Sequence, residues 1–299
     1  VTSGDVTNPL LTTADAAELT LQGMIDKANA GDTITLNSNT EIAATLQITK
    51  NLTLDLNGYV LKMGGTGRVI HITSSAEVEI KDGESNRAHT GEYAALPAGG
   101  VITGGKAESG GGILLDGGCT LKLTGGCITD CRATDTGGGG VDLRGSTAIL
   151  YISGTARIEN CTAGEVWGAN AIFNSGTMYA DGGTVDGTVN NQGTIKHSNG
   201  VTDVTVFNEA VYNRAKKIIE AGIYKGTVEN RGSITGGTFY GGVTDDGGTI
   251  RGGTFAVTFD IGDGTKTEPT LVEYNNPVPE RAAPTKSGHT FTGWYLGEE

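Results

Sequence analysis

An internal repeat runs through the second half of the chain and limits the folds open to it. The pattern apolar-x-Asn-x-Gly-x-apolar is seen at 172–178, 189–195 and 228–234, at 206–212 with Ala210 in place of the glycine, and in a looser copy at 243–250. Its asparagines are Asn174, Asn191, Asn208 and Asn230, and Asp245 takes the fifth place. Their spacings of 17, 17, 22 and 15 residues are far shorter than a domain. Such self-similarity indicates a solenoid, in which each unit buries its apolar face against its neighbours.

A longer period governs the first half of the chain. The segment GGILL at 111–115 recurs as GGVDL at 139–143, and TLKLTGG at 120–126 recurs as ILYISGT at 149–155. Within each copy, apolar residues alternate with polar ones over short runs bounded by Gly, Asn and Asp, which is typical of short strands joined by tight turns. Glycine supplies 50 residues and proline only 6, which suits frequent turns and excludes collagen.

These periods predict an all-β fold, specifically a right-handed single-stranded parallel β-helix whose coils narrow from 28–30 residues to about 17. A β-propeller would need repeats of about 40 residues, and a β-sandwich would not keep one phase along successive copies. The segment 209–222 has a helical pattern. We interpret it as a coil with an insertion of about five residues, which would explain the spacing of 22.

Both ends of the chain differ from the repeats. Residues 14–29 place Leu19, Ile25 and Ala28 near one helical face, and this pattern predicts a helix that caps the first coil. Its expected N-cap is Thr13 or Asp15, and its expected stop is Gly31.

After Phe255 the regularly spaced glycine-rich turns end, and four of the six prolines follow. The predicted organisation is therefore a cap and first strand over 1–45, a β-helix over 46–255, and a small β module over 256–299. We expect this module to pack as strands apart from the coils, with Phe291 and Trp294 buried.

Two stretches are similar to known families. The run LQGMIDKANAGDTITL, followed by TLDLNGYVL at 53–61, resembles the cap and first coil of right-handed parallel β-helix proteins of the pectate-lyase-like superfamily. The tail is similar to the Listeria–Bacteroides repeat, also called the internalin B-repeat, at Pro284, Gly288, Thr290, Phe291, Gly293, Trp294 and Tyr295. That family continues to a closing strand, so we expect the module to be incomplete here. The second resemblance implies a secreted or surface-exposed bacterial protein and no particular reaction.

The charge balance limits the partners of the protein. Acidic residues number 34 and basic residues 21, giving a formal net charge of −13. Such a surface repels phosphate backbones, so nucleic acid is not a predicted partner. No run of 18 apolar residues exists, so no membrane span is predicted. The expected location is extracellular or on the bacterial cell surface, and the expected partner is a glycan or an extracellular protein.

No catalytic residue, metal site or cofactor is predicted. Glycosidic cleavage requires two carboxylates placed across the bond, and lyase chemistry on uronates requires cations and a base. Asp245 and Asp246 are adjacent, but we interpret them as a turn substitution within the repeat. We therefore expect an adhesin-like binding or spacer protein without catalysis. The alternatives are a polysaccharide lyase or glycoside hydrolase on the same scaffold, the former with calcium, and a purely structural stalk.

An insertion at about 83–99 is the best candidate for a ligand site. Polar and aromatic side chains gather in or beside it, namely Asp82, Glu84, Arg87, His89, Glu92 and Tyr93. Long loops on rigid scaffolds often carry function. A solvated loop without a ligand would account for the same residues.

Other recurring residues are predicted to be structural. The asparagines Asn174, Asn191, Asn208 and Asn230 should form a ladder at one corner, where each amide satisfies backbone groups of its own coil and the next. The aromatic residues expected to stack mainly on neighbouring coils are Tyr151, Trp167, Tyr179, Tyr224 and Tyr240. Cys131 and Cys161 fall at equivalent places in consecutive coils. A disulfide is sterically allowed there, but we expect reduced, buried thiols.

Overall fold

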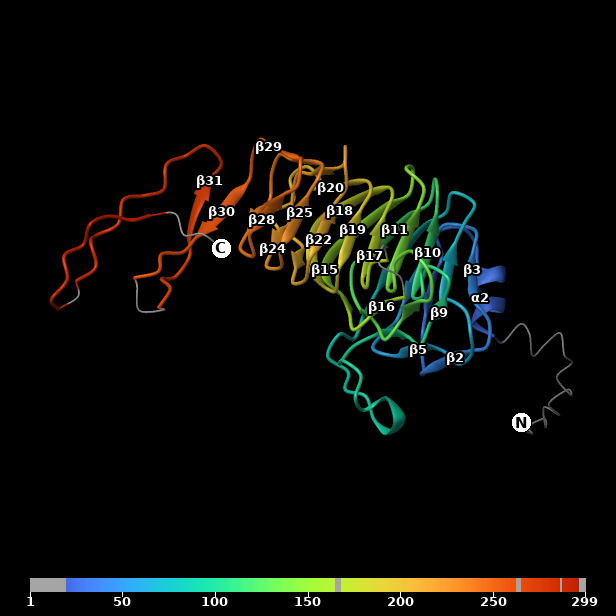
Figure 1. The fold of residues 1–299 in the computed structure, drawn as a ribbon. Coiled ribbons are helices and arrows are strands. Elements are labelled where there is room, and N and C mark those ends of the chain that lie inside the picture. The colour runs from blue at the N-terminus through green and yellow to red at the C-terminus, as the bar shows by residue number, and fades with distance from the viewer. Residues whose placement is uncertain (1–19, 165–167, 262–264, 286, 296–299) are drawn as a thin grey trace, which may run out of the picture.

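The computed structural model describes residues 20–164, 168–261, 265–285 and 287–295. Short parallel strands stack along one axis and form the coils of a parallel β-helix, with one helix at the N-terminal end (Figure 1). The predicted all-β solenoid is confirmed. The residues Thr13, Asp15, Leu19 and Trp167, on which parts of the predictions rest, lie outside the described residues.

One side of the solenoid is a nine-stranded parallel sheet to which each coil contributes one strand. Its strands are β3 (Leu46–Ile48), β6 (Ile70–Ile72), β10 (Ile113–Asp116), β14 (Val141–Arg144), β17 (Ile172–Asn174), β19 (Val189–Asn191), β22 (Val211–Asn213), β25 (Val228–Asn230) and β28 (Val243–Asp245). Ile70, Ile113 and Val141 lie in register, so equivalent residues of successive coils stack on one another.

The other two sides belong to one 19-stranded sheet. Its first row contains β1 (Thr33–Thr35), β4 (Leu52–Asp55), β7 (Glu77–Lys81), β11 (Thr120–Leu123), β20 (Thr194–Lys196), β23 (Ile218–Ile219), β26 (Ser233–Ile234) and β29 (Thr249–Ile250). Its second row contains β2 (Thr40–Ile42), β5 (Val60–Met63), β8 (Val101–Thr103), β12 (Cys127–Thr129), β21 (Val206–Phe207), β24 (Ile223–Tyr224), β27 (Thr238–Phe239) and β30 (Thr254–Val257).

Two long strands, β15 (Ile149–Glu159) and β18 (Thr177–Asp186), run through both rows and join them. Their first halves pair with the first row and their second halves with the second row. A third sheet of three strands, β9 (Lys106–Ala107), β13 (Arg132–Ala133) and β16 (Thr162–Ala163), is present only in the wide coils. Its loss after β16 explains why the later coils are shorter.

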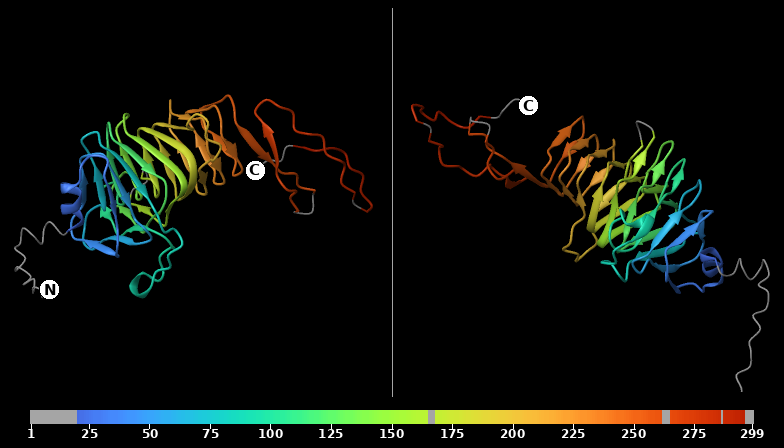
Figure 2. Two further views of the ribbon diagram at one scale, coloured as in Figure 1. Left: turned by 180° about the vertical axis from the view of Figure 1, so that it is seen from behind. Right: turned by 90° about the horizontal axis from the view of Figure 1, so that it is seen from below.

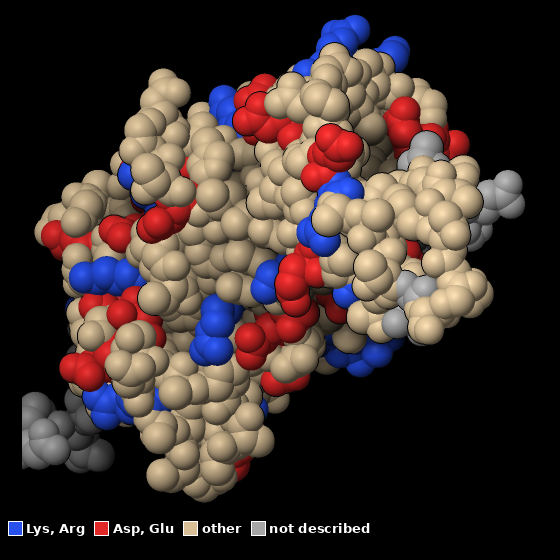
Figure 3. All heavy atoms as spheres, turned by 90° about the vertical axis from the view of Figure 1, so that its left-hand side faces the viewer, with Lys and Arg blue, Asp and Glu red and all other residues tan. Residues whose placement is uncertain are grey.

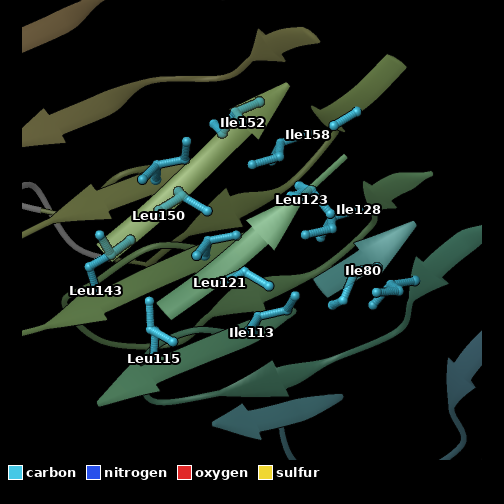
Figure 4. Close-up of a cluster of buried hydrophobic side chains, with 14 of the residues drawn as sticks. Ile80, Ile113, Leu115, Leu121, Leu123, Ile128, Leu143, Leu150, Ile152 and Ile158 are labelled. Carbon is cyan, nitrogen blue, oxygen red and sulfur yellow. The ribbon is translucent and has the colours of Figure 1, made fainter. Parts of the chain in front are cut away.

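Inward-facing aliphatic side chains form one continuous core along the axis. Figure 4 shows Leu121, Leu123, Leu150 and Ile152 of two neighbouring strands facing Ile128 and Ile158 across the interior. These six side chains are at most 1% exposed. Burying each such side chain contributes about 1.5–3 kcal/mol. The alternation of apolar and polar residues in the sequence therefore drives coil stacking.

An asparagine ladder lines one corner of the narrow coils, but its members differ from the prediction. The register pairs Asn174, Asn191, Asn213 and Asn230, with Asp245 at the end. Asn208 is not in the ladder; it follows β21 on another side. The prediction was wrong because Asn208 also follows two apolar residues, and only the pairing of the strands separates the two positions.

The extra residues of that coil also lie elsewhere than predicted. Tyr179 pairs with Lys196, and Thr184 pairs with Val206, so the additional residues fall between Lys196 and Val206. The segment 209–222 is a coil, as predicted, and contains β22 and β23. Its helical pattern is overridden by pairing with β19 and β20.

The helix α2 (Leu21–Lys27) closes the N-terminal end of the core. Leu21 and Ile25 are buried, and Thr20 is the N-cap, accepting a hydrogen bond from the Gly23 amide. The Gln22 side chain donates to the Gln47 carbonyl at 3.1 Å and accepts from the Gln47 amide at 2.8 Å. Because Gln47 lies in the edge strand β3, the helix satisfies backbone groups that would otherwise be unpaired.

At the C-terminal end the tail continues from the last coil. The strand β30 pairs in parallel with β27 of the preceding coil and antiparallel with β31 (Thr270–Glu273) of the tail. It therefore belongs to the solenoid and to the tail. Within the described residues, β31 is the one strand that belongs to the tail alone. Trp294 packs edge-on against Phe259 and Phe291 and is half-buried, whereas Phe291 is 37% exposed. The expectation that Phe291 is buried was wrong, because a two-stranded tail offers no second layer to cover it.

Candidate functional site

The loop 83–99 leaves the solenoid after β7, returns at β8 and projects to one side (Figures 1 and 2). Asp82 holds its two ends together. Its Oδ1 accepts a hydrogen bond from the Gly58 amide at 2.6 Å, and its Oδ2 accepts one from the Gly100 amide at 2.7 Å. Both carboxylate oxygens are thus engaged by backbone groups, which gives Asp82 a structural role.

Most of the other predicted site residues also hold the loop. The Arg87 guanidinium lies 4.3 Å from the centre of the Tyr59 ring, and His89 Nε2 lies 2.8 Å from the Gly99 carbonyl. A short 3-10 helix at Gly91–Tyr93 then brings Glu92 to 3.5 Å from Lys62 Nζ.

Tyr93 and Leu96 pack on a small apolar cluster under the loop, made of Val60, Val101 and Cys127. Glu84 is exposed, and its backbone amide faces Asp82 Oδ1 at 3.4 Å. The six predicted residues therefore lie in or beside the loop, and Asp82 is the one among them that also lines the groove described next. That the loop is a ligand site stays a prediction.

A groove of about 360 Å³ lies between the loop and the neighbouring coils. Its walls are Asp82, Ser85, Asn86, Pro97, Ala98, Gly126, Thr155 and Arg157. Arg157 Nη2 donates to the Ala98 carbonyl at 3.2 Å, and Nη1 lies 3.9 Å from Glu159 Oε2. The guanidinium thus connects the long strand β15 to the returning end of the loop.

The groove is suited to hydrogen bonding. Within the described part of the chain, the side chains of Ser85, Asn86 and Thr155 make no hydrogen bond, so their donors and acceptors are available to a ligand. The carboxylate that lines the groove, Asp82, is held by two amides. The arrangement resembles a polar binding pocket more than a pair of carboxylates placed across a bond.

Sequence reasoning missed Thr155 and Arg157. They lie more than 50 residues beyond the loop in the chain. Their strand, β15, is two coils away from β8, where the loop returns, with β12 between them. The 28–30-residue period could have found them, because it places β15 beside β12 and β12 beside β8.

The aromatic residues stack mainly on each other, as predicted. The rings of Tyr151 and Tyr179 are 4.4 Å apart with an interplanar angle of 6°, and Lys196 Nζ lies 4.8 Å from the centre of the Tyr179 ring. Neighbours therefore occupy ring faces that a sugar would need. Tyr224 is fully buried in an inner column with Phe207, Phe239 and Phe255. Tyr240 differs, because it is 44% exposed.

The cysteines are buried free thiols, as predicted for Cys131 and Cys161. Cys131 Sγ donates to the Thr129 carbonyl at 3.4 Å, and Cys161 Sγ donates to the Ile128 carbonyl at 3.7 Å. Contact with Cys131 and burial raise the pKa of the Cys161 thiol, and burial raises the pKa of Cys127. The thiols of Cys161 and Cys127 are therefore poor nucleophiles.

Charged side chains of both signs are interspersed on the face seen in Figure 3. No helix among the described residues has the length and apolarity needed to cross a membrane. In the same part of the chain, no three side chains of His, Cys, Asp or Glu are grouped so that they could hold a metal ion.

Comparison with known families identifies the tail. The sequence model of the Listeria-Bacteroides repeat domain matches residues 255–299, which include β31 and all of β30 except Thr254. This repeat is typical of bacterial surface proteins. No curated protein and no solved structure matches the chain significantly. Membership of the pectate-lyase-like superfamily therefore stays a prediction.

Proposed function

We propose that this protein is an adhesin-like binding module of the bacterial cell surface, whose groove beside the loop 83–99 holds a saccharide unit of a glycan. The observation that carries the proposal is the groove itself, with unpaired polar side chains on the loop (Ser85 and Asn86) and on β15 (Thr155). A cavity of about 360 Å³ suits one or two sugar rings better than a protein surface.

The rigidity of the loop supports this reading. Asp82 and Arg87 fix the loop to the solenoid and His89 joins its two arms, so the groove exists before a ligand arrives and little ordering entropy is lost on binding. The repeat in the tail supports a surface location, where a solenoid can present such a groove away from the cell.

The test is retention on a glycan array, followed by affinity measurements on the glycans retained. We expect the double variant Asn86→Ala/Arg157→Gln to lower affinity at least about tenfold, since it removes the Asn86 amide and replaces the Arg157 guanidinium with a shorter, neutral amide. Glu84→Ala is the matched control, because Glu84 is in the same loop but does not line the groove.

Three results would contradict the proposal. Equal losses in both variants would mean that the loop, not the groove, is responsible. Retention of no glycan would favour a structural stalk. Release of reducing ends or of an unsaturated product would favour an enzyme on the same scaffold.

A further inference from the structure

A second groove, of about 420 Å³, lies where the last coils of the solenoid meet the tail, and we call it the junction groove. It shares no residue with the groove beside the loop 83–99. Two glycine pairs line it, at 236–237 and 252–253, together with Thr238, Arg251, Thr254, Glu273 and Tyr274. Two successive coils and the end of β31 thus contribute to it (Figure 1).

Coil stacking keeps part of this groove free of side chains. A Cβ on Gly236 would clash with the carbonyl oxygen of Glu220, and a Cβ on Gly252 would clash with that of Thr235. Neither position accepts a larger residue without moving the coils apart. The solenoid therefore presents bare backbone between the polar side chains of the groove.

The polar side chains on the solenoid side are unpaired. Thr238 and Thr254 are register partners, and they face outward because Phe239 and Phe255 beside them stack inside the coils. Within the described residues, the side chains of Thr238, Thr254 and Arg251 make no hydrogen bond or ion pair. Their donors and acceptors are available to a ligand.

The tail side of the groove is held in place by backbone pairing. Thr254 pairs with Glu273, and the Tyr274 amide donates to the Gly253 carbonyl at 2.9 Å. In the turn that follows, the Asn276 amide donates to the Glu273 carbonyl at 3.0 Å, and Asn276 Nδ2 donates to Glu273 Oε2 at 3.2 Å. The junction groove therefore exists before a ligand arrives.

Tyr274 gives the groove an open aromatic surface. It is 39% exposed, and within the described residues its ring contacts no other ring and no cation. The rings of Tyr151 and Tyr179, in contrast, cover each other. An open tyrosine ring beside hydrogen-bonding groups suits a pyranose, whose carbon atoms pack on the ring while its hydroxyls reach the polar side chains.

The charges of the junction groove favour a neutral sugar. Arg251 and Glu273 are the charged side chains that line it, one basic and one acidic. An acidic sugar would gain near Arg251 about what it loses near Glu273. Sugar hydroxyls can use both, because a guanidinium donates hydrogen bonds and a carboxylate accepts them.

We propose that the junction groove binds a neutral oligosaccharide, with one pyranose ring against Tyr274 and its hydroxyls bonded to Arg251, Glu273 and the two threonines. The chain then has two separate sugar sites and contacts a glycan-coated surface at two points, which increases avidity. The gain in avidity rests on the proposed function of the groove beside the loop 83–99, whereas the junction site itself does not.

The experiment follows the ring signals of isotope-labelled tyrosine in the whole chain by nuclear magnetic resonance. The signals of Tyr274 and Tyr240 are assigned by their loss in Tyr274→Phe and Tyr240→Phe. The probes are the neutral sugars cellohexaose, chitohexaose and mannohexaose, with a hyaluronan hexasaccharide as the acidic comparison. We expect at least one neutral sugar to shift the Tyr274 signal and to leave the signal of Tyr240, which is exposed outside the groove, in place.

A charge variant assigns the binding to the junction groove. Arg251→Gln should weaken binding of the neutral sugar at least about fivefold, because a charge-assisted hydrogen bond is lost. Arg231→Gln is the matched control: it makes the same charge change one coil away, at an arginine that pairs with Asp246 and does not line the groove.

No shift of the Tyr274 signal with any of the three neutral sugars would overturn the proposal. An equal shift of the Tyr240 signal, an equal loss in Arg231→Gln or tighter binding of hyaluronan would also contradict it. In Asn86→Ala/Arg157→Gln the Tyr274 shift should persist, with an affinity within about twofold of the wild type. Failure of one groove can therefore be told apart from failure of the other.

Discussion

Asn191 shows how a single side chain can satisfy the polar groups of two coils. Its Oδ1 accepts from the Gly193 amide at 3.2 Å and from Asn174 Nδ2 at 2.8 Å. Its Nδ2 donates to Asn213 Oδ1 at 2.9 Å and to the Ile218 carbonyl at 3.1 Å. All the hydrogen-bonding capacity of the amide is used in a fully buried position, so the corner can turn without water.

The glycine of the Asn-x-Gly motif has an equally local cause. A Cβ on Gly193 would lie 1.9 Å from the Gly176 carbonyl oxygen of the preceding coil. Three of the four asparagines of the ladder are followed two residues later by a glycine, whereas Asn213 is followed by Ala215. This pairing explains why the two residues recur together in the sequence.

Replacing Asn191 with Ala should lower the free energy of unfolding by about 2–4 kcal/mol, because buried backbone groups lose their partners. Chemical denaturation followed by circular dichroism measures the change. Asn208→Ala is the control and should cost less than about 0.5 kcal/mol, since Asn208 is only half-buried and outside the ladder. Similar losses in both variants would contradict the ladder.

Tyr224 makes the stability sensitive to alkaline pH. It is fully buried between Phe207 and Phe239, and its hydroxyl donates to the Ala221 carbonyl at 2.6 Å. Burial raises the pKa of this hydroxyl above its ordinary value of 10.0. The unfolded chain ionises first, so the contribution of Tyr224 is complete below pH 10 and declines as pH rises, by up to about 1.4 kcal/mol per pH unit.

Tyr224→Phe removes both the hydrogen bond and the ionisation. At pH 8 we expect the variant to be less stable than the wild type by about 1 kcal/mol. At pH 11 the difference should shrink or reverse. Urea denaturation at both pH values measures it, and a difference that stays constant would show that Tyr224 does not control the alkaline response.

Among the elements, α2 is short and depends on its contacts. With seven residues it would not be stable in isolation. Its stability comes from burial of Leu21 and Ile25, from the paired hydrogen bonds of Gln22, and from Lys50 Nζ, which donates to the Asp26 and Ala28 carbonyls at the helix end.

A charge on the buried face of α2 should therefore expose the first coil. Ile25→Asp is expected to destabilise the protein by at least about 3 kcal/mol and to produce aggregates, because the edge of β3 becomes available for pairing. Met24→Asp is the control, because Met24 is 45% exposed on the same helix. Size-exclusion chromatography with light scattering distinguishes them, and a monomeric Ile25→Asp variant of unchanged stability would refute the capping role.

Sequence periodicity predicts the elements well where the pattern of one strand repeats in the next. The wide coils were found because Leu121 and Leu150, which pair in register, lie in matching sequence contexts. Periodicity does not predict which residue joins the ladder where two segments of one coil have similar sequences, as at Asn208 and Asn213. There the sequence carries two similar patterns, and hydrogen bonding between strands selects one of them.

The candidate groove was predictable only in part. The loop 83–99 stands out as an interruption of the period, so its position could be inferred. The 28–30-residue period places the strand of Thr155 and Arg157 two coils from the start of β8, but which residues of that strand line the groove depends on the direction in which the loop folds back.

For the whole molecule, stacking limits how far a perturbation spreads. Each coil contacts only its neighbours, so stability is close to a sum of local terms. Phe239→Ala opens a cavity in the aromatic column and should cost about 3–5 kcal/mol. Hydrogen exchange should show lost protection in β24, β27 and β30, with β4 and β7 unchanged. Uniform loss along the chain would indicate one cooperative unit instead.

The asparagine ladder also has a direction. Each amide passes a hydrogen bond toward the C-terminal end, and the last one runs from Asn230 Nδ2 to Asp245 Oδ1 at 2.8 Å. An ionised carboxylate accepts hydrogen bonds but has none to give. A further asparagine-bearing coil placed beyond Asp245 would therefore meet no donor from this corner, and a second copy meeting end to end would bring two negative charges together. By this chemistry Asp245 disfavours the stacking of another asparagine-bearing coil at this corner.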